Sequence, residues 1–257
     1  MKYAQSIAKQ LFLLCYGAFF STLCLAKVYV HHTYLDPQIS HKLVAKHLPT
    51  NPIILEAGAF DGTDTLILKK LWPHSTVYAF EPHPSIYLDL AKKVAGVDGI
   101  YAYELGLANR DGNAMFYEST ENGKPFMSGS LIEPKEHLKH APSVLFKNQI
   151  AIKVATIDSW AKQQHLDHID FMWLDLQGSE LEVMQAAPQI MQTVKALMVE
   201  VEFVEAYKAQ PQYLAVRHWL EGQGFELVAT DFADYNSAKP KGKAACHWFG
   251  NILMVRK

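Results

Sequence analysis

Short runs of apolar residues alternate along the chain with longer segments in which apolar residues recur at helical spacing. Apolar runs of about four to eight residues predict buried strands, and the longer segments predict amphipathic helices. This alternation is typical of βαβ units and predicts one doubly wound α/β domain. We expect strands at residues 53–57, 76–80, 100–105, 150–155, 169–174, 196–202, 225–230 and 248–255, and helices at 63–71, 84–95, 157–165, 180–187 and 211–222.

Three local patterns add detail to this prediction. The polar sequence NRDGN at 109–113 separates a short apolar stretch from residues 114–117 and indicates a β-hairpin. Ser179 and Glu182 have the spacing of a capping box at the start of a helix. Residues 118–148 carry glycine and proline at irregular spacing, and a loop of this length is usually either functional or mobile.

An apolar segment precedes the predicted domain. Residues 11–26 (LFLLCYGAFFSTLCLA) are uncharged and lie between Lys9 and Lys27. The segment is short for a membrane-spanning helix, which needs about 20 residues, and long for the core of a signal peptide. Continuation to Val30 would give a membrane anchor, cleavage after residue 26 would make it a signal peptide, and a buried first helix is the third alternative. We therefore divide the chain into a hydrophobic segment (1–30), a linker (31–50) and a domain (51–257).

The composition is that of a globular protein. Hydrophobic residues make up 49% of the 257 positions, which excludes a disordered chain. Lys and Arg number 24 against 26 Asp and Glu, without long runs of one sign, so no nucleic-acid partner is expected. Cys15 and Cys24 lie in the apolar segment and leave Cys246 alone, which argues against a disulfide framework. The histidines show no spacing typical of metal ligands, and no metal is expected.

The first strand-to-helix connection, EAGAFDG at 56–62, is the strongest local pattern. Its glycines allow the backbone to pass close to a ligand at a helix N-terminus. Counted from Gly58, the later glycine positions of a dinucleotide fingerprint are occupied by Phe60 and Thr63, which argues against a dehydrogenase. The acidic Glu56 favours a ligand with a positive charge, such as a sulfonium or an ammonium group. A tight turn without a ligand is the alternative.

Acidic residues also end three later strands. Glu81, before Pro82, is placed to accept hydrogen bonds from both hydroxyls of a ribose, unless it is a solvated residue. Asp175 ends the fourth strand of the expected sheet and would point into the crevice. Glu200 and Glu202 share one face of the fifth strand because side chains alternate with a period of two. With Asp175 they could form a base, a metal site or a hydrogen-bonded support, and spacing does not choose among these. Asp170, at the start of the fourth strand, is expected to be solvated or paired.

Taken together, the sequence blocks resemble one family. The series ILEAGAFDGTDT, VYAFEPHP, GLANRDGNAMFY, ATIDSW, WLDLQGSELEVMQAA, VEVEFVEAYKAQP and NILMVRK, over about residues 50–257, is similar to FkbM-type S-adenosylmethionine-dependent methyltransferases. The resemblance implies a class I methyltransferase sheet of seven strands in the order 3-2-1-4-5-7-6, with strand 7 antiparallel. It also implies O-methylation as the chemistry. Many members carry a lysine where this chain has Trp173, so no lysine-dependent role is assigned.

The resemblance also implies roles for individual residues. The loop 56–62 would hold the methionine part of S-adenosylmethionine, Glu81 its ribose, and Asp175 would lie near the transferred methyl group. Position at the carboxyl edge of the sheet, rather than the resemblance, makes residues 118–148 the expected lid over the acceptor, closed with the help of Tyr207, and also indicates the base. Asp175 is the expected base or orienting group, with Glu200 and Glu202 as second choices. The expected cofactor-binding residues are Glu56, Gly58, Ala59, Phe60, Asp61, Gly62, Glu81, Pro82, Leu107 and Asp175.

The expected function is therefore methylation of a hydroxyl group on a sugar, a glycan or a small metabolite. Two alternatives from another class are a membrane-tethered module that binds the cofactor without turnover and a module that binds nucleotide-sugars. The apolar segment would associate the protein with a membrane and leave the catalytic domain facing the cytosol, or would direct export after cleavage.

Overall fold

The structure is a computed structural model, and it describes residues 39–232 and 248–257. The apolar segment at 11–30 lies outside the described residues, so its expected role as an anchor or a signal stays a prediction. Within the described part of the chain, no helix is both long enough and apolar enough to cross a membrane.

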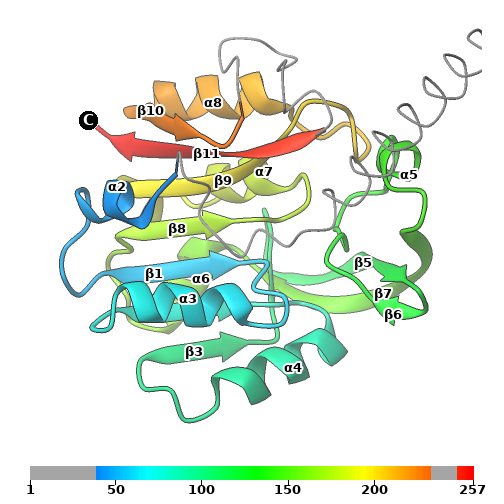
Figure 1. The fold of residues 1–257 in the computed structure, drawn as a ribbon, viewed down its shortest axis with the longest axis horizontal. Coiled ribbons are helices and arrows are strands. Elements are labelled where there is room, and N and C mark those ends of the chain that lie inside the picture. The colour runs from blue at the N-terminus through cyan, green and yellow to red at the C-terminus, as the bar shows by residue number, and fades with distance from the viewer. Residues whose placement is uncertain (1–38, 233–247) are drawn as a thin grey trace, which may run out of the picture. The chain divides into compact units, whose positions relative to one another are not determined.

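Seven strands form the main sheet, in the order β3-β2-β1-β8-β9-β11-β10 (Figure 1). Adjacent strands are parallel except β11, which runs antiparallel to both β9 and β10. Numbered along the chain as the first to seventh strands of this sheet, the order is 3-2-1-4-5-7-6. The strands are β1 (Ile53–Ala57), β2 (Thr76–Phe80), β3 (Ile100–Tyr103), β8 (Phe171–Leu174), β9 (Ala196–Glu202), β10 (Phe225–Thr230) and β11 (Phe249–Arg256).

The helices expected between these strands are confirmed, with ends that differ by two residues or fewer. Gly62 adopts a left-handed backbone immediately before α3, and Pro84 begins α4, where its missing N–H group costs no hydrogen bond. The described helices are α2 (His41–Ala45), α3 (Thr63–Leu71), α4 (Pro84–Val94), α5 (His137–His140), α6 (Ile157–Gln163), α7 (Glu180–Gln185) and α8 (Tyr213–Gly222), with the 3-10 turn η1 (Ile190–Gln192).

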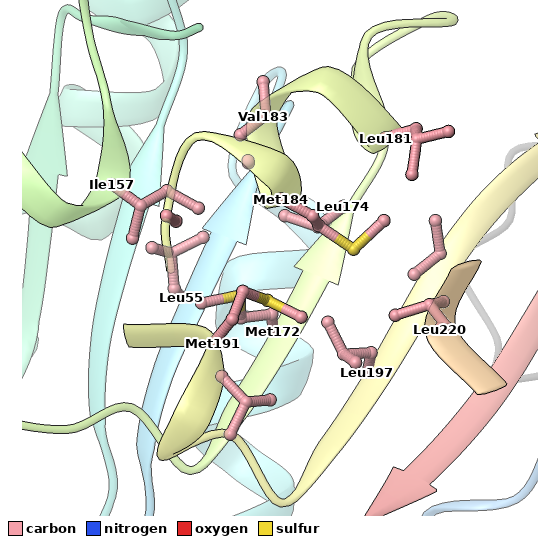
Figure 2. Close-up of a cluster of buried hydrophobic side chains, with 14 of the residues drawn as sticks. Leu55, Ile157, Met172, Leu174, Leu181, Val183, Met184, Met191, Leu197 and Leu220 are labelled. Atoms are coloured by element: carbon pink, nitrogen blue, oxygen red, sulfur yellow. The ribbon is translucent and has the colours of Figure 1, made fainter. Parts of the chain in front are cut away.

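Helices cover both faces of the main sheet, and this explains why its strands are apolar at nearly every position. Leu55 points to the face covered by α6, α7, η1 and α8, where the larger hydrophobic cluster lies (Figure 2). Its neighbour Ile54 points to the opposite face, against α2 and α3. Trp173 is on that second face and is 9% exposed, so it packs as a core residue where many relatives of the resembled family carry lysine.

A second, smaller sheet corrects the expected hairpin at 109–113. Its order is β4-β7-β5-β6, so β4 and β5 are not neighbours, because β7 lies between them. Asp111 does not close a tight turn; its carboxylate accepts hydrogen bonds from Thr156 N (2.8 Å) and Ser159 Oγ (2.6 Å). The long strand β7 therefore pairs with both β4 and β5. The strands are β4 (Gly106–Leu107), β5 (Gly112–Glu121), β6 (Lys124–Pro125) and β7 (Leu145–Ala155).

Two other expectations change in the same region. The expected long loop at 118–148 is shorter, because β5 continues to Glu121 and β7 begins at Leu145.

The expected capping box is absent: Ser179 has φ −96° and ψ 0°, and its side chain caps no N–H group. Glu182 instead accepts a hydrogen bond from Asn109 Nδ2 at 2.9 Å. A capping hydroxyl needs an extended backbone, which Ser179 lacks.

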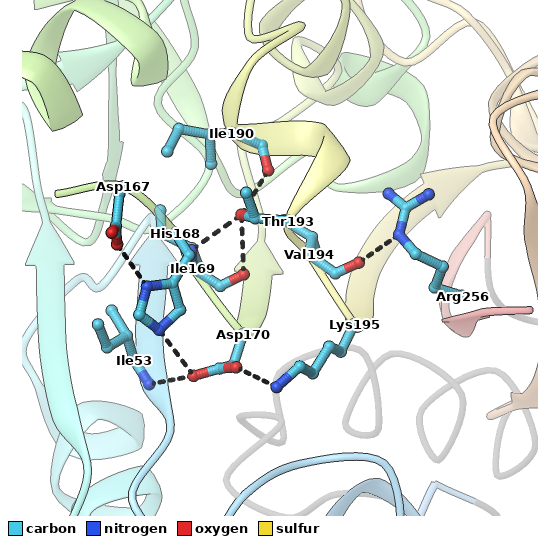
Figure 3. A network of polar contacts seen from close by, with 10 residues as sticks. All are labelled: Ile53, Asp167, His168, Ile169, Asp170, Ile190, Thr193, Val194, Lys195 and Arg256. Atoms are coloured by element: carbon cyan, nitrogen blue, oxygen red, sulfur yellow. Dashed lines mark hydrogen bonds and ion pairs between the residues drawn. The ribbon is translucent and has the colours of Figure 1, made fainter.

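Asp170 is paired rather than solvated, and it ties three strands together at their amino ends (Figure 3). Its side chain is 3% exposed and accepts hydrogen bonds from Ile53 N at 2.9 Å and Lys195 Nζ at 2.8 Å. Ile53 begins β1 and Lys195 precedes β9. The carboxylate therefore satisfies the backbone N–H group of Ile53 at the start of β1.

We expect Asp170→Ala to lower the free energy of unfolding by about 2–3 kcal/mol, because it leaves a buried donor without an acceptor. The control Asp167→Ala, whose side chain is 94% exposed, should change it by less than about 0.5 kcal/mol. Urea unfolding measures both values, and equal effects would contradict the role given to Asp170.

Candidate functional site

The carboxyl ends of four parallel strands meet at one edge of the main sheet. Register shows this directly, because Ala57 pairs with Phe80 and with Leu174, and Leu174 pairs with Val199. Residues that follow these positions therefore come together, as expected for ligand sites in doubly wound sheets. The edge gathers the expected acidic residues, which are Glu56, Glu81, Asp175, Glu200 and Glu202.

Gly58 brings two of these connections into contact. Its φ is +85°, and a Cβ atom placed on it would lie 2.0 Å from the backbone oxygen of Asp175. The N–H groups of Gly58 and Ala59 both donate to Phe80 O, at 3.0 and 2.9 Å, and Asp175 N donates to Ala57 O at 3.0 Å. Only glycine satisfies both the backbone angle and the space at this position.

The rest of the 56–62 loop is held by side chains around it. Phe60 also has a positive φ, of 46°, and its N–H group donates to Glu81 Oε2 at 3.1 Å. Asp61 accepts a hydrogen bond from Thr63 N at 3.0 Å and is ion-paired with Lys93. Burial raises the pKa of Asp61, but the hydrogen bonds from Lys93 and Thr63 outweigh it and lower the pKa.

Glu81 is buried, so the alternative of a solvated glutamate is wrong. Its side chain accepts hydrogen bonds from Phe60 N and from His83 N, the latter at 2.8 Å. Burial raises its pKa to about 8, despite these two donors. The carboxyl group is thus held rigidly at the end of β2 and keeps lone pairs for further donors.

Glu56 and Asp64 add to the acidity around the loop. Glu56 is 3% exposed and accepts a hydrogen bond from Thr65 Oγ1 at 2.6 Å, and burial raises its pKa to about 8. Burial and the charges of Asp175 and Asp61 raise the pKa of Asp64 to about 7. Each of these groups is easier to ionise when a cation is nearby.

Asp175, Glu200 and Glu202 form a second group of acids next to the first. Asp175 is half-buried, whereas Glu200 and Glu202 are 5% and 1% exposed. Burial raises the pKa of both glutamates well above the usual range, and the Asp175 charge adds to this. Both glutamates are therefore harder to ionise than usual, and Asp175 is the most accessible carboxyl group of the three.

Gln177 connects this group and was not identified from the sequence. Its Nε2 lies 2.7 Å from Asp175 Oδ1 and 2.7 Å from Glu200 Oε2. Tyr207, the residue expected to help close a lid, is 0% exposed and its hydroxyl lies 2.7 Å from Gln177 Oε1. Gln177 lies within the WLDLQGSE block, but nothing in the sequence indicates its φ of 52° or its three partners.

Glu180 holds the turn after β8 through hydrogen bonds from the backbone. The Glu180 carboxylate is buried and accepts from Leu176 N at 2.6 Å and Gly178 N at 3.1 Å, and burial raises its pKa to about 7.

Of the other expected cofactor-binding residues, Pro82 is half-buried beside Glu81, and Leu107 is 1% exposed in the larger hydrophobic cluster. Among the described residues, no group of three or more His, Cys, Asp or Glu side chains could hold a metal ion.

A cavity of about 360 Å³ lies beside the turn after β8. One wall comes from the second sheet and includes Arg110 and Tyr117, and another comes from the start of α7 and includes Ser179 and Glu182. Leu131 and Ile132, from the expected lid, also line it. Its lining therefore combines an aromatic ring, aliphatic groups and charges of both signs.

Comparison with known proteins points in one direction. Residues 56–227 match the methyltransferase FkbM domain. The chain is 27% identical to the 2-O-methyltransferase NoeI of Sinorhizobium fredii over 195 residues, which cover 75% of this chain and 79% of that protein. It is 25% identical to methyltransferase sdnD of Sordaria araneosa, with 81% and 86% covered. A solved methyltransferase FkbM from Methylobacillus flagellatus is 12% identical, with a TM-score of 0.49 and coverage of 80% of this chain and 44% of that one.

We expect Gly58→Ala to lower the free energy of unfolding by about 3 kcal/mol or more, because it combines a positive φ with a clash against Asp175 O. Gly96→Ala is the matched control, because Gly96 has a φ of 77° and open space around its Cβ position. That control should lose only about 1 kcal/mol. Unfolding in urea measures both, and equal losses would show that the close approach is unimportant.

Proposed function

The chain belongs to the FkbM methyltransferase family, and on this basis we propose that it transfers a methyl group from S-adenosylmethionine to a hydroxyl group. The observation that carries the proposal is the edge where the close turn at Gly58 lies between the buried carboxyl of Glu81 and the half-buried Asp175. The relative named as a 2-O-methyltransferase supports oxygen as the methyl acceptor.

The residues at this edge fit the cofactor. The contact between Gly58 and Asp175 O packs the 58–62 loop against the turn after β8, so this loop would hold the methionine part next to Asp175. Glu81 accepts hydrogen bonds from the ribose hydroxyls with the lone pairs that Phe60 N and His83 N leave free. When bound, the cofactor supplies a methyl group on a positively charged sulfonium.

The acids at this edge favour a cationic ligand over a neutral one. Glu56, Glu81 and Asp64 have raised pKa values of about 8, 8 and 7, mainly because they are buried. A nearby positive charge lowers each of these pKa values and so releases protons. The methylated cofactor carries this charge and its product S-adenosylhomocysteine does not, which gives the chain a means to distinguish them.

Asp175 is the group that we assign to the acceptor hydroxyl. It is the most accessible of the three expected carboxylates, while Glu200 and Glu202 are buried and burial raises their pKa values. Asp175 orients the acceptor hydroxyl and takes its proton as the oxygen attacks. Alignment of the two reacting groups by the rigid strand ends supplies most of the rate.

The cavity beside the turn after β8 supports a sugar-like acceptor. Tyr117 offers a ring face, and Arg110 and Glu182 offer a donor and an acceptor for hydroxyl groups. Ser179 in its wall is four residues from Asp175, so the cavity and the acidic edge share one turn.

We expect the full chain to bind S-adenosylmethionine and S-adenosylhomocysteine with micromolar affinity in calorimetric titrations. Glu81→Gln should weaken both about tenfold, equivalent to about 1.4 kcal/mol, since one acceptor for the ribose is lost. Glu118→Gln is the control, because Glu118 contacts the His83 ring at 2.9 Å from the second sheet and lies outside the expected cofactor site. A folded protein that binds neither compound would overturn the proposed function, and binding without turnover of any acceptor would favour a binding module.

With an acceptor that supports turnover, we expect Asp175→Asn to lower kcat about 100-fold while S-adenosylhomocysteine binds within about threefold of its original affinity. Formation of S-adenosylhomocysteine measures the rate. Glu202→Gln is the comparison, since burial raises the pKa of Glu202 and glutamine keeps the shape of the side chain. A larger loss of kcat in Glu202→Gln than in Asp175→Asn would move the base to β9.

A further inference from the structure

Gln177 is held in an unusual conformation in the turn between β8 and α7. Its φ is 52°, a left-handed value that costs a residue with a side chain on the order of 1 kcal/mol or more. Its backbone oxygen accepts a hydrogen bond from Ser130 Oγ at 2.8 Å, from the segment that follows β6. A conformation of this kind persists only where the surroundings hold it, and it often marks a functional position.

The amide of Gln177 makes three short contacts that fix its orientation. Both hydrogens of Nε2 are directed to carboxyl oxygens, one on Asp175 and one on Glu200, each at 2.7 Å. The opposite atom, Oε1, accepts from the Tyr207 hydroxyl at 2.7 Å. In this orientation the two N–H donors face carboxyl oxygens and the carbonyl oxygen faces a hydroxyl, so every contact pairs a donor with an acceptor.

Tyr207 is well suited to hold the amide in this way. It is 0% exposed, and burial and the charges of Glu202 and Glu200 raise its pKa well above the usual range. The hydroxyl therefore keeps its proton and remains a donor. Its single hydrogen is shared between Gln177 Oε1 and the backbone oxygen of Ser128, which lies 2.9 Å from the hydroxyl in the same segment as Ser130.

Acids from several elements lie close enough to Asp175 to respond to its charge. Its charge raises the pKa of Glu56, Asp64, Glu81, Glu180, Glu200 and Glu202, which lie on or beside β1, α3, β2, α7 and β9. A negative charge in such surroundings needs hydrogen-bond donors. A lysine would supply donors but cancel the charge, whereas an amide supplies them and leaves the charge for a ligand.

We propose that Gln177 is a positioning residue: its amide holds Asp175 against Glu200 and preserves the negative charge that makes the site prefer a sulfonium over the neutral product. This inference rests on the proposed function. It assigns to Gln177 no contact with the cofactor, because both N–H donors of its amide already serve Asp175 and Glu200.

The test compares the affinities of the full chain for S-adenosylmethionine and S-adenosylhomocysteine by calorimetry. We expect Gln177→Met, which keeps the length of the side chain and removes the donors, to reduce the ratio of the Kd for S-adenosylhomocysteine to the Kd for S-adenosylmethionine about tenfold. Gln164→Met is the matched control, because Gln164 also accepts from a tyrosine hydroxyl, that of Tyr103 at 3.1 Å, away from this group of acids. It should leave the ratio unchanged.

A double-mutant cycle separates positioning from general loss of structure. Asp175→Asn alone should lower the same ratio, and adding Gln177→Met to it should change the ratio less than twofold, because the amide acts only through Asp175. If Gln177→Met does not fold, Tyr207→Phe is the second variant, since it removes only the hydroxyl that orients the amide. It should lower the ratio about threefold.

The outcomes distinguish the inference from the function on which it rests. Binding of neither compound by the wild-type chain would overturn both. Normal binding with an unchanged ratio in Gln177→Met and Tyr207→Phe would overturn the inference alone, and so would an equal effect of Gln177→Met with and without Asp175→Asn.

Discussion

The candidate site depends on keeping several carboxyl groups out of water without an equal number of cations. Burial of a charge is costly unless hydrogen bonds compensate for it, and here most of the donors are neutral. Backbone N–H groups serve Glu81 and Glu180, a hydroxyl serves Glu56, and an amide serves Asp175 and Glu200. The result is an edge that is acidic, rigid and poorly hydrated. Such an edge gains most from a ligand that brings its own positive charge.

The parallel sheet supplies the precision that this arrangement needs. The ends of β1, β2, β8 and β9 are aligned by their register, so residues far apart in the chain are adjacent at the edge. Gly58 carries this alignment into the connections, because the loop after β1 touches the backbone of Asp175 with no side chain between them. At the opposite end of the same strands, Asp170 fixes β1 against β8 and β9 (Figure 3).

The sequence predicts the elements of the main sheet well and the local details poorly. Residues 53–57, 63–71 and 196–202 form their elements with the expected bounds, because strands buried on both faces and helices with one apolar side have clear patterns. The hairpin at 109–113 is wrong because β4 and β5 both pair with β7, which begins only at Leu145. Glu81 and Asp175 are found by their places at strand ends, but Gln177 is missed because tertiary contacts hold its backbone.

The second sheet and the acidic edge are linked through Gln177. Ser130 holds its backbone, and Tyr207, anchored on Ser128, holds its side chain. The same segment continues to Leu131 and Ile132 in the wall of the cavity proposed for the acceptor. Ser130 directly precedes Leu131, so one short segment both lines the cavity and holds the backbone of Gln177. The support of the acidic edge and the wall of the cavity therefore share their residues, and the fold cannot form one without the other in place.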